Sequence, residues 1–233
     1  MEQQFDAGKI GIWLFLATEV LFFGGLFTVY SIYRANHPQL YHIGQYFLTW
    51  EMGAINTAVL IFSSLTAAWA VRAAQLNQKK ILVSMLVITF LCAATFMVVK
   101  YFEYSHKIHE GVLWGQAFNP SDAELNHVIE KIEHKGGDPK AIEFLEAIKE
   151  RPVAEKKDMV APLQMFFSIY FFMTGLHGIH VLVGMGLIAW LIVRASKGQF
   201  NNRYFAPVDS VALYWHIVDL IWIFLFPLFY LIG

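Results

Sequence analysis

A glutamate lies in the middle of an apolar stretch close to the N-terminus. Glu19 is the only charged residue of WLFLATEVLFFGG, residues 13–25, and its helical neighbours three, four and seven positions away are all apolar. An ionisable side chain in such surroundings is rare, so it indicates either a structural pair or a functional site. Two interpretations are open: a neutral carboxyl hydrogen-bonded between helices, or a carboxyl that exchanges protons or faces lipid. In both, its partner must come from outside its own helix.

Two further apolar runs contain pairs of polar residues at helical spacing. His177 and His180 lie three apart in TGLHGIHVLVGMG, and His216 and Asp219 lie three apart in YWHIVDLIW, so each pair shares one helix face. The two histidines favour hydrogen bonding between helices, with ligation of a metal or haem iron and contact with a lipid or partner as alternatives. For His216 and Asp219 we expect a local ion pair that holds two helices together, with a proton or lipid contact as the alternative.

Small and polar residues predict close contacts between helices. Gly175, Gly178 and Gly184 would let a neighbouring backbone approach, as small residues do in membrane helices. The run NTAVLIFSSLT begins with Asn56, and its amide and hydroxyl side chains are expected to bond to other helices. The hydroxyl residues of this run are Thr57, Ser63, Ser64 and Thr66.

A third polar group follows the third apolar run. In KYFEYSHKIHEG, residues Glu103, His106 and Glu110 are spaced at i, i+3 and i+7, which places them near one helix face. These side chains could bind a cation. The favoured interpretation is a band of titratable groups at the membrane edge, where water is available.

No motif of a soluble enzyme occurs. The single cysteine, Cys92, excludes an intrachain disulfide and any CxxC motif. The sequence contains no phosphate-binding glycine loop, no nucleophile elbow and no HExxH zinc motif, and its net charge of −1 gives no basic field for nucleic acid. We therefore expect no catalytic residue, no metal site and no nucleic-acid partner on this chain.

Composition points to a membrane protein. Of 233 residues, 57% are hydrophobic and 15% are charged, whereas soluble domains have about 45–50% and about 25%. Long runs almost free of charge predict five spans in one membrane domain, because about 20 residues cross the hydrocarbon as a helix. The spans are residues 10–33, 52–71, 81–99, 162–193 and 210–233, so the fold class is all-α and polytopic. The fourth span, longer than a bilayer needs, should tilt or project into water.

Basic residues near the span ends predict the orientation. Lysine and arginine concentrate on the side of the N-terminus, which is therefore inside, and the C-terminus is outside. The N-terminal MEQQFDAGK lacks the features of a cleaved signal, so the first span should be retained. The inner basic residues are Lys9, Arg72, Lys79, Lys80, Arg194, Lys197 and Arg203.

The long outer loop, residues 105–161, should hold a helical hairpin. Ser121 and Glu124 form a capping-box pattern, and apolar residues then repeat at helical spacing up to Gly136-Gly137. A second helix starts at Asp138-Pro139 and stops before Pro152. The apolar stripes are Leu125, Val128, Ile129 and Ile132 in the first helix, and Ile142, Leu145 and Ile148 in the second.

Taken in order, five runs resemble the successive helices of subunit III of haem–copper oxygen reductases, the cytochrome c oxidase type. They are KIGIWLFLATEVLFFGGLF, NTAVLIFSSLT, KYFEYSHKIHEG, FFMTGLHGIHVLVGMG and YWHIVDLIWIFLF. Five motifs in one order are far more specific than any single motif. Only the outer loop, from about residue 115 to 160, falls outside the resemblance.

The resemblance implies an accessory subunit. Subunit III in this family carries no haem or copper, packs on subunit I, and supports proton uptake and stability during oxygen reduction. Glu19 resembles the family's buried carboxyl that reacts with carbodiimide, and His177, His180, His216 and Asp219 match motif positions. The expected cofactors of this chain are therefore none, apart from a bound phospholipid, while haem and copper belong to partner subunits I and II.

Several alternatives stay open. Many family members have seven helices, and the two expected to be missing here are the first two, which some short relatives obtain from an extended subunit I. The resemblance implies a bacterial protein of the cell (inner) membrane in contact with lipids. An accessory chain of a quinol oxidase or nitric oxide reductase remains possible, as does, from other classes, a His-ligated membrane cytochrome or a proton carrier that uses Glu19 and Asp219.

Overall fold

The computed structural model describes residues 2–134, 137–150 and 153–231, and in this part of the chain it is all-helical. Five helices, α1, α3, α4, α7 and α8, are long and apolar enough to cross a membrane, which confirms the predicted fold class. The elements are α1 (Glu2–Asn36), α2 (Pro38–Tyr46), α3 (Trp50–Gln75), α4 (Lys79–His109), the 3₁₀ turn η1 (Gly115–Ala117), α5 (Asp122–His134), α6 (Pro139–Glu150), α7 (Val153–Ser196) and α8 (Ala206–Tyr230).

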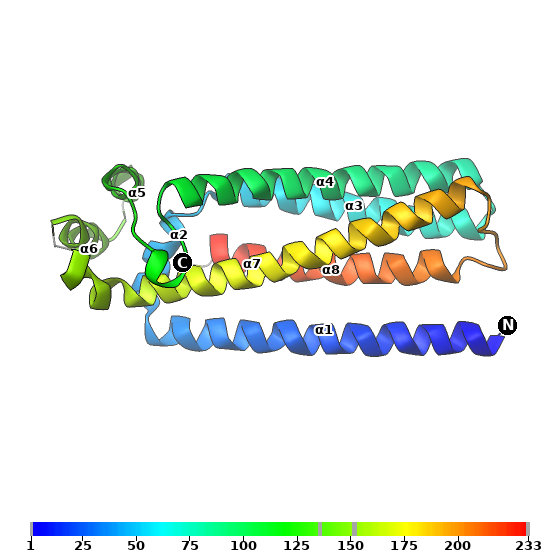
Figure 1. The fold of residues 1–233 in the computed structure, drawn as a ribbon, viewed down its shortest axis with the longest axis horizontal. Helices are drawn as coiled ribbons and strands as arrows, with labels where there is room; N and C mark the ends of the chain where they lie inside the picture. Colours follow the sequence, from blue (N-terminus) through cyan, green and yellow to red (C-terminus); the bar gives the residue numbers. More distant parts are fainter. Residues whose placement is uncertain (1, 135–136, 151–152, 232–233) are drawn as a thin grey trace.

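Four of the long helices form a bundle, and the first lies along its side. Helices α3, α4, α7 and α8 pack together, while α1 contacts α7 and α8 (Figure 1). In its most apolar window α8 has 50% of its residues buried and α1 has 11%. The bundle therefore centres on α8, and most of the apolar surface of α1 faces outward.

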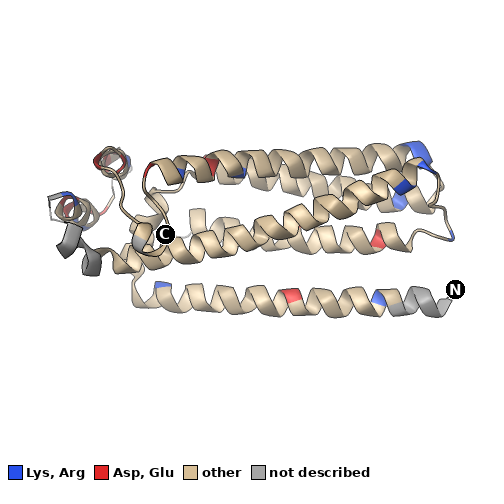
Figure 2. Cartoon of the chain, in the orientation of Figure 1, with Lys and Arg blue, Asp and Glu red and all other residues tan. Residues whose placement is uncertain are grey.

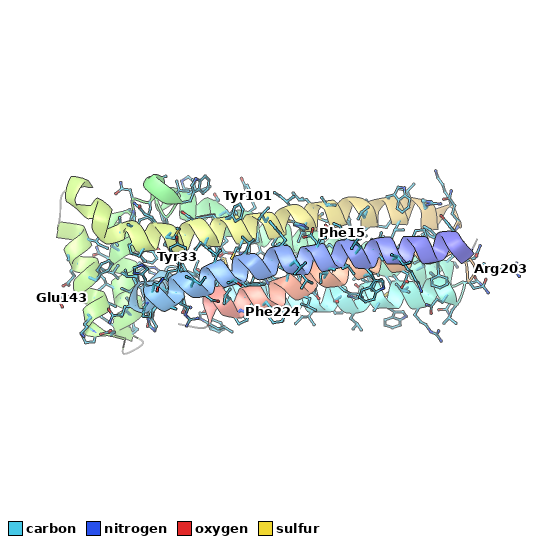
Figure 3. The ribbon with its side chains drawn as sticks, turned by 90° about the horizontal axis from the view of Figure 1, so that it is seen from below. Phe15, Tyr33, Tyr101, Glu143, Arg203 and Phe224 are labelled. Atoms are coloured by element: carbon cyan, nitrogen blue, oxygen red, sulfur yellow. The ribbon has the colours of Figure 1, made fainter. Side chains whose placement is uncertain are left out.

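Aromatic side chains join α1 to the bundle. Figure 3 looks onto α1, which lies over the seam between α7 and α8. Phe15 stacks on Tyr214 with ring centroids 5.9 Å apart, and Phe27 meets Phe224 edge-on at 6.3 Å. The Tyr30 hydroxyl, near the other end of α1, donates a hydrogen bond of 2.8 Å to the carbonyl of Leu228.

The connections alternate between the two ends of the bundle as predicted. The N-terminus, the α3–α4 turn and the α7–α8 connection lie at one end, and α2, α5, α6 and the end of α8 lie at the other (Figure 1). Lysine and arginine gather at the N-terminal end (Figure 2). This distribution fits the expected orientation, although which end faces the cytoplasm stays a prediction.

Helix ends differ from the predicted spans wherever a charge interrupts the apolar run. Helix α4 continues to His109 instead of ending at residue 99, and α7 begins at Val153 and passes through Pro162. The predicted spans are runs of uncharged residues, so a lysine ends the predicted span. It does not end the helix, because the backbone hydrogen bonds continue past it. At 44 residues, α7 is about 66 Å long and crosses the bundle obliquely (Figure 1), as its length predicted.

A short helical cap, consisting of α2, α5 and α6, covers one end of the bundle. Helices α5 and α6 lie where the outer hairpin was expected, and the Ser121 hydroxyl accepts the Glu124 amide at 3.2 Å. The expected stop signals Gly136 and Pro152 lie outside the described residues. Helix α2, which begins with Pro38 at its first position, was not predicted. The buried stripes of the hairpin are Leu125, Val128, Ile132, Ala141, Leu145 and Ile148.

Among the described residues, the glycines of α7 lie against aromatic rings or open space, not against another backbone. A Cβ at Gly184 would lie 2.8 Å from the ring of Trp215, whereas Gly175 and Gly178 have no neighbouring atom of this chain within 4 Å of that position. The predicted backbone approach is therefore not seen within this chain, and an approach by a partner chain at Gly175 or Gly178 stays a prediction. Large aromatic side chains of α8 fill the space that the absent side chain of Gly184 leaves.

We expect Gly184→Ala to lower the thermal stability of the purified protein relative to Gly186→Ala. Both changes raise helix propensity equally, but only the first places a methyl group against the buried ring of Trp215, and such overpacking costs about 1–3 kcal/mol. The midpoints of thermal unfolding in detergent measure the difference. Equal midpoints would show that the α7–α8 contact is looser than described.

Candidate functional site

The partner of Glu19 is a histidine on another helix. Glu19 Oε2 of α1 lies 3.0 Å from Nε2 of His180 on α7, off the direction of an ideal hydrogen bond, and both side chains are mostly buried. The second ring nitrogen, Nδ1, lies 2.8 Å from the Leu176 carbonyl. Since a carbonyl only accepts, Nδ1 carries a hydrogen, and Nε2 either accepts from a carboxylic acid or donates to a carboxylate. The pair holds one proton and no net charge in either form.

This placement favours the first interpretation of Glu19, a carboxyl bonded between helices. It also gives α1 a polar contact in the middle of an otherwise apolar surface. The edge of the Phe23 ring meets the His180 imidazole at 5.6 Å, and the Tyr214 hydroxyl donates to the His180 carbonyl at 2.9 Å. The imidazole is therefore held by the Leu176 carbonyl at Nδ1 and by the Phe23 ring, while Tyr214 holds the backbone of α7 at the same residue.

His177 has surroundings unlike those of His180, although both were expected on one face. It is fully buried between the rings of Phe96 and Trp222, whose centroids lie 5.5 and 5.1 Å from the imidazole. Within the described residues, neither of its ring nitrogens has a hydrogen-bond partner, and the same holds for the side-chain amide of Asn56. The predicted interhelical hydrogen bonds of His177 and Asn56 are therefore not seen within this chain.

A serine replaces the predicted ion pair between His216 and Asp219. The Ser64 hydroxyl of α3 lies 2.7 Å from Nδ1 of His216, while Oδ1 of Asp219 is buried without a hydrogen-bond partner among the described residues. No ion pair joins the two α8 residues in the part of the chain that the structure describes. The expected local pair is not seen, because a hydroxyl from the neighbouring helix is the partner of the His216 imidazole instead.

Other hydroxyl groups of α3 form the expected bonds to neighbouring helices. The indole nitrogen of Trp222 donates to Thr57 at 3.1 Å, and that of Trp215 donates to Ser63 at 2.9 Å. Thr66 bonds Thr89 of α4 at 2.8 Å. Hydroxyl side chains thus connect α3 to both of its neighbours.

The most strongly bonded polar group of the bundle was not predicted as such. We call it the lysine–glutamate cluster: Lys100, Glu103 and Lys107 of α4 with Tyr170 of α7 and Tyr230 of α8. Lys100 Nζ lies 2.8 Å from Oε2 of Glu103 and donates to the Tyr230 hydroxyl at 3.0 Å. The other carboxylate oxygen accepts from both tyrosine hydroxyls, that of Tyr170 at 2.7 Å.

Each lysine of this cluster has a further contact that stabilises its charge. Lys100 Nζ lies 4.5 Å from the ring centroid of Trp222, a cation–π distance. Lys107 Nζ donates to the Phe47 carbonyl at 3.2 Å. Each buried charge therefore has polar or aromatic partners, and the cluster ties α4, α7, α8 and the end of α2 together.

Glu103 belongs to this cluster and not to the expected membrane-edge group with His106 and Glu110. The Glu103 side chain is 3% exposed and turns into the bundle, whereas that of His106 is 71% exposed and lies 2.7 Å from Glu110. Among the described residues no three His, Cys, Asp or Glu side chains are grouped to hold a metal ion. The sequence signal for the cluster was the spacing of Lys100, Glu103 and Lys107 on one face, with opposite charges three and four apart.

Comparisons with known proteins agree with the sequence motifs. A family model described as cytochrome c oxidase subunit III matches residues 159–233. Cytochrome c oxidase subunit 3 of Loxodonta africana is 26% identical over 97% of this chain and 69% of its own length. The probable quinol oxidase subunit 3 of Staphylococcus saprophyticus is 26% identical, over 98% and 90%, and the cytochrome bo(3) ubiquinol oxidase subunit 3 of Pseudomonas putida is 25% identical, over 98% and 88%.

We expect Lys100→Met to destabilise the protein by about 3–5 kcal/mol, because it leaves the Glu103 carboxylate buried without its closest cation. Glu103→Gln should cost a similar amount, and the double variant should cost clearly less than the sum. Thermal or denaturant unfolding of the purified protein measures each value. Lys80→Met, an exposed lysine of the same helix, serves as the control and should stay within about 0.5 kcal/mol of the wild type. Strict additivity would contradict a direct interaction.

Proposed function

We propose that this chain, a member of the cytochrome c oxidase subunit III family, is the non-redox accessory subunit of a respiratory terminal oxidase. The observation that carries the proposal is the likeness to oxidase subunits 3 over nearly the whole chain, together with five membrane-spanning helices. As such a subunit it is a multi-pass membrane protein of a multi-subunit oxidase complex. Its location in the bacterial cell membrane and its contact with subunits I and II are part of the proposal.

The histidine geometry supports a role without redox cofactors on this chain. Both ring nitrogens of His180 already contact protein atoms, and His216 is engaged by Ser64. The rings of Phe96 and Trp222 enclose His177 on two sides. Among the described residues, His180 and His216 thus already have protein contacts at ring nitrogens, and only His177 has both nitrogens without a partner. Haem and copper are assigned to the partner subunits.

The Glu19–His180 pair supports a contribution to proton uptake. It holds one proton between two groups at the middle of a span, and transfer of that proton between them leaves the net charge unchanged. Such an exchange avoids placing an isolated charge in the apolar bundle, which is the main cost of moving protons there. Glu19 is therefore the proposed proton-linked carboxyl, and a bound phospholipid remains compatible with the exposed surface of α1.

Quinol is the second candidate electron donor of the complex. Relatives named as quinol oxidase subunits match this chain as extensively as one named cytochrome c oxidase subunit 3. The donor binds elsewhere in the complex, so the accessory role is the same for both.

Affinity purification through a tag on this chain should recover a haem–copper subunit. The same chain produced alone should show no Soret absorption band. Oxygen consumption by the purified complex with reduced cytochrome c or with quinol then identifies the donor. A Soret band from the isolated chain, or recovery without any haem-containing partner, would overturn the proposal.

Two replacements of Glu19 should differ in their effect on the assembly of the complex. Glu19→Gln keeps a hydrogen-bonding group of the same size beside His180 and should assemble at the wild-type level. Glu19→Lys should strongly reduce assembly, since a lysine at mid-membrane costs about 2.5–3.5 kcal/mol and would face an imidazole instead of a carboxyl. The yield of complex per unit of tagged chain measures both. Glu51→Lys, at the exposed start of α3, is the matched control and should assemble normally.

A further inference from the structure

A cavity lies at the cap end of the bundle, between the end of α1, the first half of α2 and the start of α6. Its volume is about 430 Å³, within the range of about 300–1,000 Å³ that is typical of small-molecule sites. Helix α2 follows directly from α1 at this end of the molecule (Figure 1). The lining includes no member of the Glu19–His180 pair or of the lysine–glutamate cluster, so this cavity is a separate feature.

Basic side chains outnumber acidic ones in the lining of this cavity. Arg34 of α1 and Lys140 of α6 each carry one positive charge, and Asp138 carries the one negative charge among the described lining residues. With His42 neutral, the sum is two positive charges and one negative charge, a net charge of +1. Oδ1 of Asp138 accepts the backbone amide of Lys140 at 3.0 Å, so this carboxylate caps the start of α6. Within the described part of the chain, neither Arg34 nor Lys140 forms an ion pair.

Apolar side chains form the rest of the wall. Ile43 is buried, and Leu40 and Phe144 are partly buried and pack against the core of the molecule. A small inorganic anion would contact the cations and leave this apolar surface uncovered. The wall therefore favours a ligand in which an anionic group is attached to an apolar part.

The cavity lies at the end of a membrane span. Arg34 is in the last turn of α1, and the span of this helix ends at Asn36. Arginine and lysine at span ends extend their charged groups toward the lipid headgroups while their stems stay on apolar surface. The apolar side chains of Val29 and Ile32, in the two turns before Arg34, are exposed. Apolar surface for acyl chains is therefore available close to the cavity.

We propose that this cavity binds the phosphodiester group of a membrane phospholipid, held by Arg34 and Lys140. A phosphodiester carries one negative charge, which balances the net charge of the lining, and the planar guanidinium of arginine matches the geometry of phosphate oxygens. The bound lipid connects the end of α1 to α6, a helix of the loop that lies outside the family resemblance. The site requires a chain in a membrane but no role in an oxidase, so its failure would leave the proposed function untouched.

Native mass spectrometry of the purified, delipidated full chain tests the site. The wild type should bind phosphatidylglycerol more tightly than diacylglycerol with the same acyl chains, which lacks the phosphate. Arg34→Gln and Lys140→Gln should each weaken the binding of phosphatidylglycerol roughly tenfold, because each removes one charge-assisted hydrogen bond. Lys149→Gln, at an exposed lysine of α6 that bonds Asn126 and does not line the cavity, is the matched control and should bind like the wild type.

Lysine labelling of the wild type needs no variant and keeps the proposal testable if the variants fold poorly. Phosphatidylglycerol should slow the acylation of Lys140 by an amine-reactive reagent, whereas diacylglycerol should not, and the rate at Lys149 should be the same with both. Equal affinity of the wild type and both variants for phosphatidylglycerol, or equal labelling of Lys140 with the two lipids, would overturn the proposal. Protection of Lys140 by inorganic phosphate but not by phosphatidylglycerol would identify a soluble anion as the ligand and overturn the lipid assignment.

Discussion

The ion pair between Lys100 and Glu103 is the interaction on which the packing of the bundle depends. A carboxylate and two ammonium groups lie buried at one level of the bundle, and an apolar interior offers them no water. Each charge must therefore meet a partner from another element, which fixes where α7, α8 and the end of α2 can lie relative to α4. Two tyrosine hydroxyls and the face of Trp222 meet that requirement. We infer that this ion pair contributes specificity of packing more than net stability.

The same constraint explains how the remaining polar groups are distributed. Glu19 of α1 lies beside a histidine of α7, Ser64 of α3 contacts His216 of α8, and Thr66 of α3 bonds Thr89 of α4. Every one of these contacts joins two different elements. Polar side chains thus define which helices are neighbours, and apolar side chains supply the area of contact.

Local patterns of the sequence predicted most of the fold, because hydropathy and helical spacing are local properties. The five spans, the two cap helices and the hydroxyl bonds of α3 followed from them. Partners from distant positions did not follow: the carboxylate of Glu103 was assigned to a membrane-edge group because Tyr170 and Tyr230 are far away in sequence. A count of uncharged residues likewise treats Lys100 as the end of a span, although the helix continues. For Gly184, the sequence showed a small residue but not that an indole ring would occupy the space.

The sparse burial of α1 has a consequence for biogenesis. This helix is synthesised before α7 and α8, yet most of its contacts with other helices are with these two. Until α7 has been inserted, Glu19 has no histidine beside it, and the nascent chain must hold an uncompensated acid within the bilayer. Although α1 is synthesised before α7 and α8, it can pack against them only after both have been inserted. Its position in the fold is therefore fixed late.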